Sequence, residues 1–551
     1  MGATTLHSRH SVAQRILAGE SLIVYRGYLL AIPHKWLQAH PGGDLAILHF
    51  IGRDATDEIE ANHTEDTLKL IPRYSIGRVE LTDGVWEPFI PPIATGWVRR
   101  PGASGKLEWY REAAEAVSTE DTKFKPSSSI LLVSKDENSY EASGPSLESL
   151  KHPPSSLSLK TQAEHSKAWR ELHQRVIDAG LYKTRYITGY GPEVVRYTLL
   201  ASLSAYAYAH NWLIPSAVFL GLFWHQLVFT AHDLGHMGVT HNWAVDRIIA
   251  TVIADFIGGL SIGWWVQNHN VHHLVTNHPS HDPDIEHLPF FAISPVFLES
   301  LWSSYYKRTM KFDAFAKFFL SLQHKLFYVV MAFARFNLYA NSYTYLYKKA
   351  FDTRRARGGS WAWRLEIAGI VFFWAWFGRV LVGCGSWQKA LVYLLVSHVV
   401  TSPLHIQIVL SHFSMPTGDL GPIESFPHRQ MRTTSDVICP ESLAFIHGGL
   451  HLQVTHHLFP RLPRHNLRQA SQLVKAFAKE QGLTYNEFGF IDGNHEVIGT
   501  LSLVAEQVKI MGKVASVEAR EAIEKRNGAA SGGERCRHLN GNGNGIHEKQ
   551  A

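Results

Sequence analysis

Apolar residues are gathered into a few long blocks along the chain, and the segments between these blocks are polar. Four blocks approach the roughly 20 residues that a helix needs to cross the hydrocarbon core of a bilayer. The pattern therefore predicts about four transmembrane helices, arranged as two hairpins. The predicted spans are residues 194–213, 215–231, 367–384 and 390–410.

A fifth apolar block, residues 247–265, has Asp255 in its middle. A charged side chain at the centre of a bilayer is costly. We therefore expect this segment to lie in the membrane interface or to pack inside the protein, and we expect the same of the aromatic stretch 326–347.

Basic residues are distributed unequally around the predicted spans. The two hairpin tips, near residues 211–214 and 385–389, hold one basic residue, Lys389, whereas the segment between the hairpins holds six between positions 348 and 364. Cytosolic loops carry the excess of Lys and Arg. The tips are therefore expected to face away from the cytosol, and both termini to be cytosolic.

Polar stretches divide the rest of the chain. Residues 8–88 mix strand and helix signals and predict a compact α+β domain. Residues 91–160 are rich in Ser, Pro and Lys and predict a flexible linker. Residues 516–551, which include NGNGNG, predict a disordered tail. The part between linker and tail, residues 161–515, is expected to be an all-α membrane domain.

Composition adds a prominent histidine content to this picture. The 551 residues include 33 histidines, clustered between positions 225 and 287 and between 398 and 465. Three cysteines, far apart, give no disulfide framework, which fits cytosol-facing domains. The net charge of +5 is modest and no basic strip is interleaved with aromatics, so nucleic acid is not an expected partner.

The sequence HPGGD, residues 40–44, places His40 at a tight turn in which Pro41 fixes φ and two glycines permit sharp bends. His63 follows within DEIEANHTEDT. Two histidines that reach a haem iron from opposite faces leave no open position, so such an iron transfers electrons and does not bind oxygen. With the flanking strands and YSIGRVE, this segment resembles cytochrome b5, which implies that His40 and His63 hold haem b.

A run of acidic residues with no basic residue surrounds His63. The run is either a solvated helix face or a docking surface that steers a basic reductase toward the haem edge, and we favour the docking surface. Its members are Asp54, Asp57, Glu58, Glu60, Glu65 and Asp66.

Three short sequences, HDLGH, HNVHH and QVTHH, place histidines about one helical turn apart on a single face. A single histidine on an apolar helix is usually a satisfied core residue. Seven histidines in three boxes at ligand spacing favour a metal site instead. The candidate residues are His232, His236, His269, His272, His273, His456 and His457, with Gln453 in the first position of the third box.

The predicted topology brings the three boxes together. The first box follows the second span, the second box follows without a crossing, and two further spans return the chain before the third box. All three are therefore expected at the cytosolic face, level with the haem domain. Imidazole-rich sites suit Fe, Cu or Zn. A fused electron carrier implies a metal that is reduced, so iron fits, and the number of ligands suggests two ions.

The order of HDLGH, HNVHH and QVTHHLFPRLPRHN within residues 190–500 resembles the membrane fatty-acyl desaturase family. The cytochrome b5 fusion and the Gln that opens the third box are similar to the front-end desaturases. The resemblance implies a diiron centre, O2 as co-substrate, and electrons that pass from NADH through a separate NADH-cytochrome b5 reductase to the haem. It also implies a multi-pass protein of the endoplasmic reticulum membrane.

Two further site residues follow from this resemblance. Gln453 occupies the slot of a histidine ligand in other desaturases, where it is either a weak oxygen ligand or a residue that orients a ligand. The family also takes one ligand from the last span. His412 matches that position best, and His405 is the second choice.

The stretch HHLVTNHPSHDPDIEHLPFFAIS, residues 272–294, is similar to the sphingolipid Δ8 branch of the front-end desaturases. This implies a double bond at C8–C9 of the long-chain base of a ceramide or related sphingolipid. The alternatives are a front-end Δ5 or Δ6 acyl-lipid desaturase, a diiron lipid hydroxylase, and a membrane electron carrier with structural histidines. A polar rim for the lipid head, or a charged loop that only braces the second box, is formed by Asp282, Asp284, Glu286 and His287.

Overall fold

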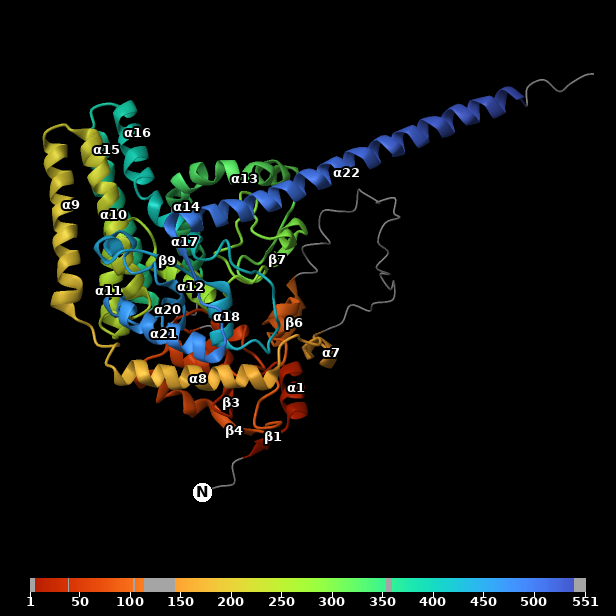
Figure 1. Ribbon diagram of the computed structural model, residues 1–551, viewed down its shortest axis with the longest axis horizontal. Helices are drawn as coiled ribbons and strands as arrows, with labels where there is room; N and C mark the ends of the chain where they lie inside the picture. The colour runs from red at the N-terminus through yellow and green to blue at the C-terminus, as the bar shows by residue number, and fades with distance from the viewer. Residues whose placement is uncertain (1–4, 38, 103–104, 113–143, 353–358, 540–551) are drawn as a thin grey trace, which may run out of the picture.

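The computed structural model describes residues 5–37, 39–102, 105–112, 144–352 and 359–539. Figure 1 shows the amino-terminal domain in red and orange at the bottom, a group of standing helices at the upper left, and the long helix α22 reaching to the upper right. An amino-terminal domain that contains a sheet is therefore followed by a helical domain, as the sequence predicts.

The amino-terminal domain is built on a four-stranded sheet in the order β1-β4-β3-β2. Strands β2 and β3 form a hairpin whose turn residues, Arg26 and Gly27, both have positive φ, at 50° and 75°. Two such residues in succession match the right-handed twist of the strands that they join. Val12, Leu22 and Leu29 lie in the core of this domain. Its elements are β1 (Leu6–His7), α1 (Arg9–Leu17), β2 (Ser21–Tyr25), β3 (Tyr28–Ile32), α2 (His34–Leu37), α3 (Leu45–Leu48), α4 (Thr56–Asn62), α5 (Glu65–Leu68), η1 (Ile71–Tyr74) and β4 (Ser75–Val79).

The segment predicted as a flexible linker, residues 91–160, differs from that prediction where the structure describes it. Its strands β5 and β6 pair as an antiparallel hairpin. Trp109 Nε1 donates a hydrogen bond of 2.9 Å to the Leu17 carbonyl, which attaches the hairpin to the amino-terminal domain. Residues 113–143 of the predicted linker lie outside the described residues. The described elements are η2 (Pro92–Thr95), β5 (Trp97–Pro101), β6 (Leu107–Arg111), α7 (Leu147–Leu150) and the start of α8 (Leu159–Asp178).

Within the described residues, three helices are long and apolar enough to cross a membrane. They are α10 (Leu213–Gly235), α15 (Gly359–Gly383) and the segment Trp387–Leu410, which comprises α16 (Trp387–Val399) and α17 (Ser402–Leu410). The predicted first span is also a helix, α9 (Gly191–Ala209), which follows the π-helical turn η3 (Tyr186–Tyr190) and packs beside α10 (Figure 1). Because Glu193 and Arg196 lie in its first turns, α9 is less apolar than the other three.

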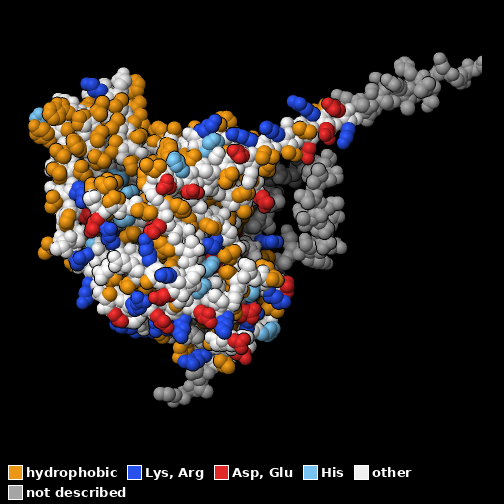
Figure 2. All heavy atoms as spheres, in the orientation of Figure 1, with side chains coloured by type: hydrophobic (Ala, Val, Ile, Leu, Met, Phe, Trp, Pro, Cys, Tyr) orange, Lys and Arg blue, Asp and Glu red, His pale blue; other side chains and the backbone are white. Residues whose placement is uncertain are grey.

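Apolar side chains cover the outside of these helices. Figure 2 shows hydrophobic atoms concentrated at the upper left, over the helices that stand there in Figure 1. Val195 on α9 is 69% exposed, and Val382 on α15 is 84% exposed. A continuous exposed apolar surface of this kind marks a membrane-facing side. The helical domain is therefore a membrane domain.

The apolar block with Asp255 in its middle folds back on itself. It contains α11 (Trp243–Thr251) and the π-helical turn η4 (Val252–Ile257), which meet α12 (Ile262–Leu274) at 114°. Asp255 is fully buried, and its Oδ2 accepts a hydrogen bond from the Ile262 backbone N–H at 3.3 Å. Counted as one bent span, the pair brings the number of candidate spans to four. The bend directs α12, which carries the second histidine box, back toward the first box.

The remaining elements lie outside the candidate spans. The predicted disordered tail begins at residue 516, whereas the structure continues α22 to Leu539. Good helix formers such as Glu, Ala and Lys in VEAREAIEK account for this difference. Residues 540–551 of the tail lie outside the described residues. The elements outside the candidate spans are η5 (Pro295–Leu298), β7 (Leu301–Ser303), β8 (Arg308–Met310), α13 (Ala314–Ala332), α14 (Ala334–Ala350), α18 (Phe426–Thr433), β9 (Ser435–Ile438), η6 (Glu441–Leu443), α19 (Ala444–His447), α20 (Gln453–Leu458), η7 (Arg464–Asn466), α21 (Leu467–Gln481), β10 (Asn486–Gly489) and α22 (Phe490–Leu539).

Candidate haem site and metal centre

His40 and His63 face each other in the amino-terminal domain, with ring centroids 6.0 Å apart. Each ring uses Nδ1 for a backbone carbonyl: His40 donates to Gly43 at 3.0 Å, and His63 donates to Ile59 at 2.9 Å. Each Nε2 is therefore left for a metal ligand bond. Burial lowers the pKa of His63 to about 4, so its imidazole is neutral, as a ligand must be. The pair fits a haem iron held between two imidazoles.

The haem site contacts the segments that carry the second and third histidine boxes. A Cβ added to Gly42 would lie 3.2 Å from Asn270 Nδ2, on the second-box helix α12. On the other side, Arg461 Nη1, just after the third box, donates to the His63 carbonyl. Ala61 shares a buried apolar cluster with Phe459. The loops of both candidate haem ligands thus contact the membrane domain.

Half of the acidic run around His63 is buried, and one of its members is paired with helix α8. Asp57, Glu58 and Glu60 are all buried. Asp57 forms a 2.7 Å ion pair with Arg170 of helix α8, which covers α4. Burial raises the pKa of Glu58 to about 7. These three of the six acids are therefore not accessible to a reductase. Asp54, Glu65 and Asp66 remain exposed.

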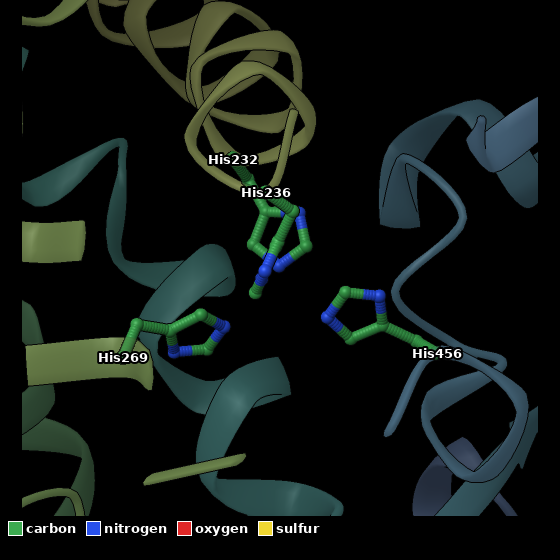
Figure 3. Close-up of side chains that lie close together, drawn as sticks. All are labelled: His232, His236, His269 and His456. Carbon is green, nitrogen blue, oxygen red and sulfur yellow. The ribbon is translucent and has the colours of Figure 1, made fainter. Parts of the chain in front are cut away.

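Histidines of all three boxes meet in a first group, shown in Figure 3. His232 and His236 come from the end of α10, His269 from α12 and His456 from α20. One ring nitrogen from each lies within 4.8 Å of those of the other three, and all four side chains point toward a common centre. Four imidazoles that converge in this way suit a first-row transition metal.

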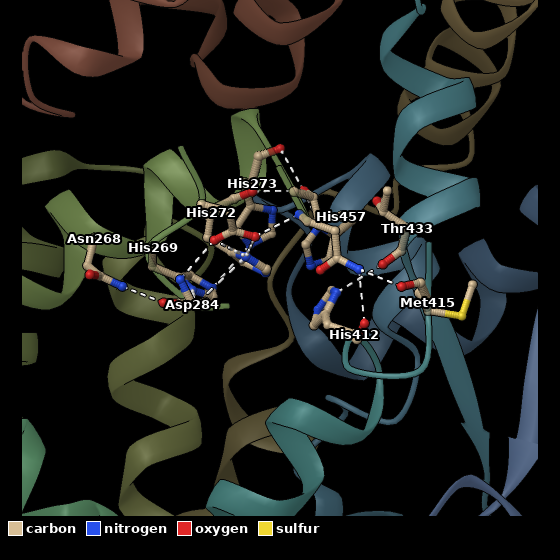
Figure 4. Close-up of polar contacts among 12 residues, drawn as sticks. Asn268, His269, His272, His273, Asp284, His412, Met415, Thr433 and His457 are labelled. Carbon is tan, nitrogen blue, oxygen red and sulfur yellow. Dashed lines mark hydrogen bonds and ion pairs between the residues drawn. The ribbon is translucent and has the colours of Figure 1, made fainter. Parts of the chain in front are cut away.

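A second group lies beside the first and contains His272, His412 and His457, whose ligand nitrogens also lie within 4.8 Å of one another (Figure 4). His412 follows the last span, so the structure brings the preferred candidate from that span into this group. His405, the second choice, belongs to neither group. It lies on α17, and its buried Nε2 has no hydrogen-bond partner in the part of the chain that the structure describes.

His273 lies between the two groups. Its Nε2 is 3.1 Å from the Nε2 atoms of His269 and His456, and its ring stacks on His457 with centroids 4.2 Å apart. Two nitrogens bound to one ion at about 2 Å each are about 3 Å apart. The eight histidines therefore form one continuous site with two centres, which suits a pair of metal ions.

Hydrogen bonds behind the rings orient the histidines. His272 Nδ1 donates to Asp282 at 2.9 Å, His457 Nδ1 to Gln430 Oε1 at 2.9 Å, and His412 Nδ1 to the Thr433 carbonyl at 3.2 Å. Metal-bound histidines almost always donate their other N–H in this way.

The Nδ1 bond of His457 leaves its Nε2 for the metal site. The Nε2 atoms of His457 and His236 are both buried and have no hydrogen-bond partner among the described residues. Burial also lowers the pKa of His457 well below its ordinary value, so its ring is neutral. A neutral, oriented imidazole with an unpartnered Nε2, as His457 has, fits a bound metal ion.

The acidic loop after the second box serves this site. Asp282 accepts from His272, and Asp284 lies 3.6 Å from His269 Nδ1 and accepts from Asn268. Glu286 accepts from Ser303 instead. Of the two interpretations of this loop, bracing of the second box is the one that the contacts favour.

Sequence reasoning missed several supporting residues. Asp233 lies inside HDLGH, 3.3 Å from His232 Nδ1 and 2.8 Å from the Tyr190 hydroxyl, so its place in the box was an available signal. Trp265 stacks on His269 with centroids 4.4 Å apart. Gln430 lies on α18, far from any box in sequence, and no local pattern marks it.

Gln453 is the first residue of α20 and is 5% exposed. The next residue, Val454, donates its backbone N–H to Asp436 Oδ1 at 2.8 Å, which fixes the start of this short helix. Gln453 thus lies one turn before His456 on the same helix. Whether its amide oxygen binds metal stays a prediction.

Two family models match the chain: "Fatty acid desaturase" over residues 209–489 and "Cytochrome b5-like Heme/Steroid binding domain" over residues 8–80. A Delta 8-(E)-sphingolipid desaturase of Emericella nidulans is 44% identical, with 92% of this chain and 95% of that protein covered. One of Komagataella phaffii is 43% identical, with 92% and 94% covered. Delta(8)-fatty-acid desaturase 2 of Arabidopsis thaliana is 31% identical, with 86% and 88% covered.

Proposed function

Because the chain belongs to the fatty acid desaturase family and carries a cytochrome b5-like domain at its amino terminus, we propose that it is a sphingolipid 8-desaturase. It introduces a double bond between C8 and C9 of the long-chain base of a ceramide or related sphingolipid. The names of the relatives that match over nearly the whole chain support this substrate. The observation that carries the proposal is the contact of the haem site with the second and third boxes.

In the proposed reaction, two neighbouring CH2 groups each lose one hydrogen and become CH=CH. O2 takes up these two hydrogens, two electrons delivered through the haem and two protons, and leaves as two waters. Two irons held by the eight histidines would supply the activation of O2 and the abstraction of hydrogen from unactivated carbon. The residues that hold them are His232, His236, His269, His272, His273, His412, His456 and His457, with Gln453 in or beside the coordination shell.

The chain's own residues perform three tasks in this proposal. Asp282 and Gln430 fix the Nδ1–H tautomers of His272 and His457, so that Nε2 faces the site. Trp265 covers His269 with an apolar ring and helps to exclude water. The remaining contact, from Arg461 to the His63 carbonyl, holds the haem domain against the third box.

Electrons come, in this proposal, from NADH through a separate cytochrome b5 reductase to haem b between His40 and His63. Glu65 and Asp66, the exposed acids beside His63, support a contact with a basic partner. The unequal distribution of basic residues around the spans supports cytosolic termini in the endoplasmic reticulum membrane.

Expression in a yeast that lacks sphingoid-base desaturation tests the proposal. Mass spectrometry is expected to find Δ8-unsaturated long-chain bases with the wild-type chain and none with His272→Ala. Fatty acids with a new Δ5 or Δ6 bond and saturated bases would favour an acyl-lipid desaturase. Hydroxylated bases without a new double bond would favour a hydroxylase. A purified chain that contains haem iron alone would favour an electron carrier.

A further inference from the structure

A cavity of about 100 Å³ lies beside the first histidine box, between helices α11, α12, α14 and α15. Leu234 and Gly235, which belong to the first box, form part of its wall, and Val266 lies one turn before His269. The opposite end of the cavity is polar. The polar groups there come from Arg247, Tyr345, Lys349 and Glu366.

The polar end combines an ion pair with one donor that is unpaired among the described residues. Glu366 forms an ion pair with Arg247, and its Oε2 accepts from the Gly263 N–H at 3.1 Å. Arg247 Nε is buried and has no partner among the described residues. A Cβ on Gly263 would lie 2.6 Å from Arg247 Nη2, so only glycine leaves room for the ion pair at this point of α12.

We infer that this cavity binds the polar head of the substrate, namely the hydroxyl and amide groups on the first carbons of the long-chain base. The inference rests on the proposed function and names the site that sets the position of the double bond. A head held at a fixed place beside the first box brings a fixed number of carbons to the metal site. Desaturation at a set distance from the head requires such a fixed point.

The size and charge of the cavity favour this ligand. Its volume has room for several water-sized groups, which fits a small polar head and not a whole lipid. Arg247 is paired with Glu366, and Lys349 with Asp352 at 3.2 Å. A cavity with paired charges favours a neutral head with donors and acceptors over a phosphate, which Glu366 repels.

The place of the cavity in the membrane domain agrees with a lipid head. It lies at the first turns of α15, where Ala362 lines it, and this end of the helix follows the basic segment that is expected to be cytosolic. Lipid heads lie at that bilayer surface. Leu234, Ile262 and Val266 add apolar lining to the same cavity, and Leu234 lies inside the first histidine box.

The test uses the full chain in microsomes with ceramide as substrate and measures KM, kcat and double-bond position. Tyr345→Phe removes one hydroxyl from the cavity and is expected to raise KM about tenfold, the worth of one hydrogen bond, and to yield bases unsaturated at neighbouring carbons. Glu366→Gln is expected to do the same. Tyr347→Phe is the matched control, because Tyr347 lies on the same helix but is 69% exposed.

Unchanged KM and double-bond position in Tyr345→Phe, or an equal change in Tyr347→Phe, would overturn the inference. Tyr345→Phe tests the inference even if Glu366→Gln does not fold, because the Phe variant keeps the aromatic ring and leaves the ion pair between Arg247 and Glu366 intact. A wild-type chain that makes no unsaturated base contradicts the proposed function instead, so the two failures are distinguishable.

Discussion

Arg461 donates a hydrogen bond from Nη1 to the backbone carbonyl of His63. One partner is a candidate haem ligand, and the other follows the third-box residue His457 by four positions. Arg461 is buried, and its guanidinium lies 5.6 Å from the centre of the Tyr182 ring. The contact therefore links the two cofactor sites through one hydrogen bond and a short stretch of backbone.

Loss of this contact is expected to slow the oxidation of the reduced haem. In Arg461→Gln the shorter side chain does not reach the His63 carbonyl, so the haem domain is held less firmly against the third box. Stopped-flow absorbance of the reduced haem, mixed with O2 and substrate, is expected to show an oxidation several-fold slower than in the wild-type chain. Haem and iron contents are expected to stay at wild-type values.

Two variants control this experiment. Arg170→Gln breaks the ion pair with Asp57 on the same docking face, away from the haem ligands, and is expected to change the rate little. His456→Ala gives the rate of haem oxidation without the metal site. Equal slowing in Arg170→Gln and Arg461→Gln would assign the effect to domain docking in general.

The haem pair is expected to give the purified chain a low-spin spectrum with two histidine ligands and no binding of CO, because no coordination position is open. His40→Ala and His63→Ala are each expected to lose this spectrum. His10→Ala, an exposed histidine of the same domain, is the control and is expected to keep it. A wild-type haem that binds CO would contradict the assignment.

The metal site is expected to hold close to two non-haem irons per chain, measured by elemental analysis. His272→Ala and His456→Ala, one from each group, are expected to abolish product while the protein still accumulates. Asp282→Asn weakens the acceptor behind His272 and is expected to lower iron affinity about 10- to 100-fold. Glu286→Gln is the control from the same loop, because Glu286 accepts from Ser303 and not from a histidine.

Gln453→Ala and Gln453→His are both expected to lose most desaturase activity. The slot is buried at the start of α20, one turn before His456, and an oxygen donor there gives a weaker ligand or a different orientation than an imidazole. Product formation per iron in each variant is the measurement. Wild-type activity in the His variant would show that the slot accepts any ligand.

The sequence alone determined the features that depend on near neighbours. The spacing of three or four residues in HNVHH and QVTHH places ligands on one helix face, because a helix turns every 3.6 residues. The length of the apolar blocks determined the membrane helices in the same way. The two candidate haem ligands, in HPGGD and at His63, could also be identified from the sequence, because the cytochrome b5 resemblance covers both.

Only the tertiary structure decided how these local pieces meet. It separated the histidines into two groups, placed His412 beside His272 and His457, and turned Asp57 from a free surface acid into a partner of Arg170. These contacts join residues far apart in the sequence, such as Asp57 and Arg170 at a separation of 113 positions, and no period along the chain encodes them. Such pairs are selected by packing and by the cost of burying an unpaired polar group, which act on the folded chain as a whole.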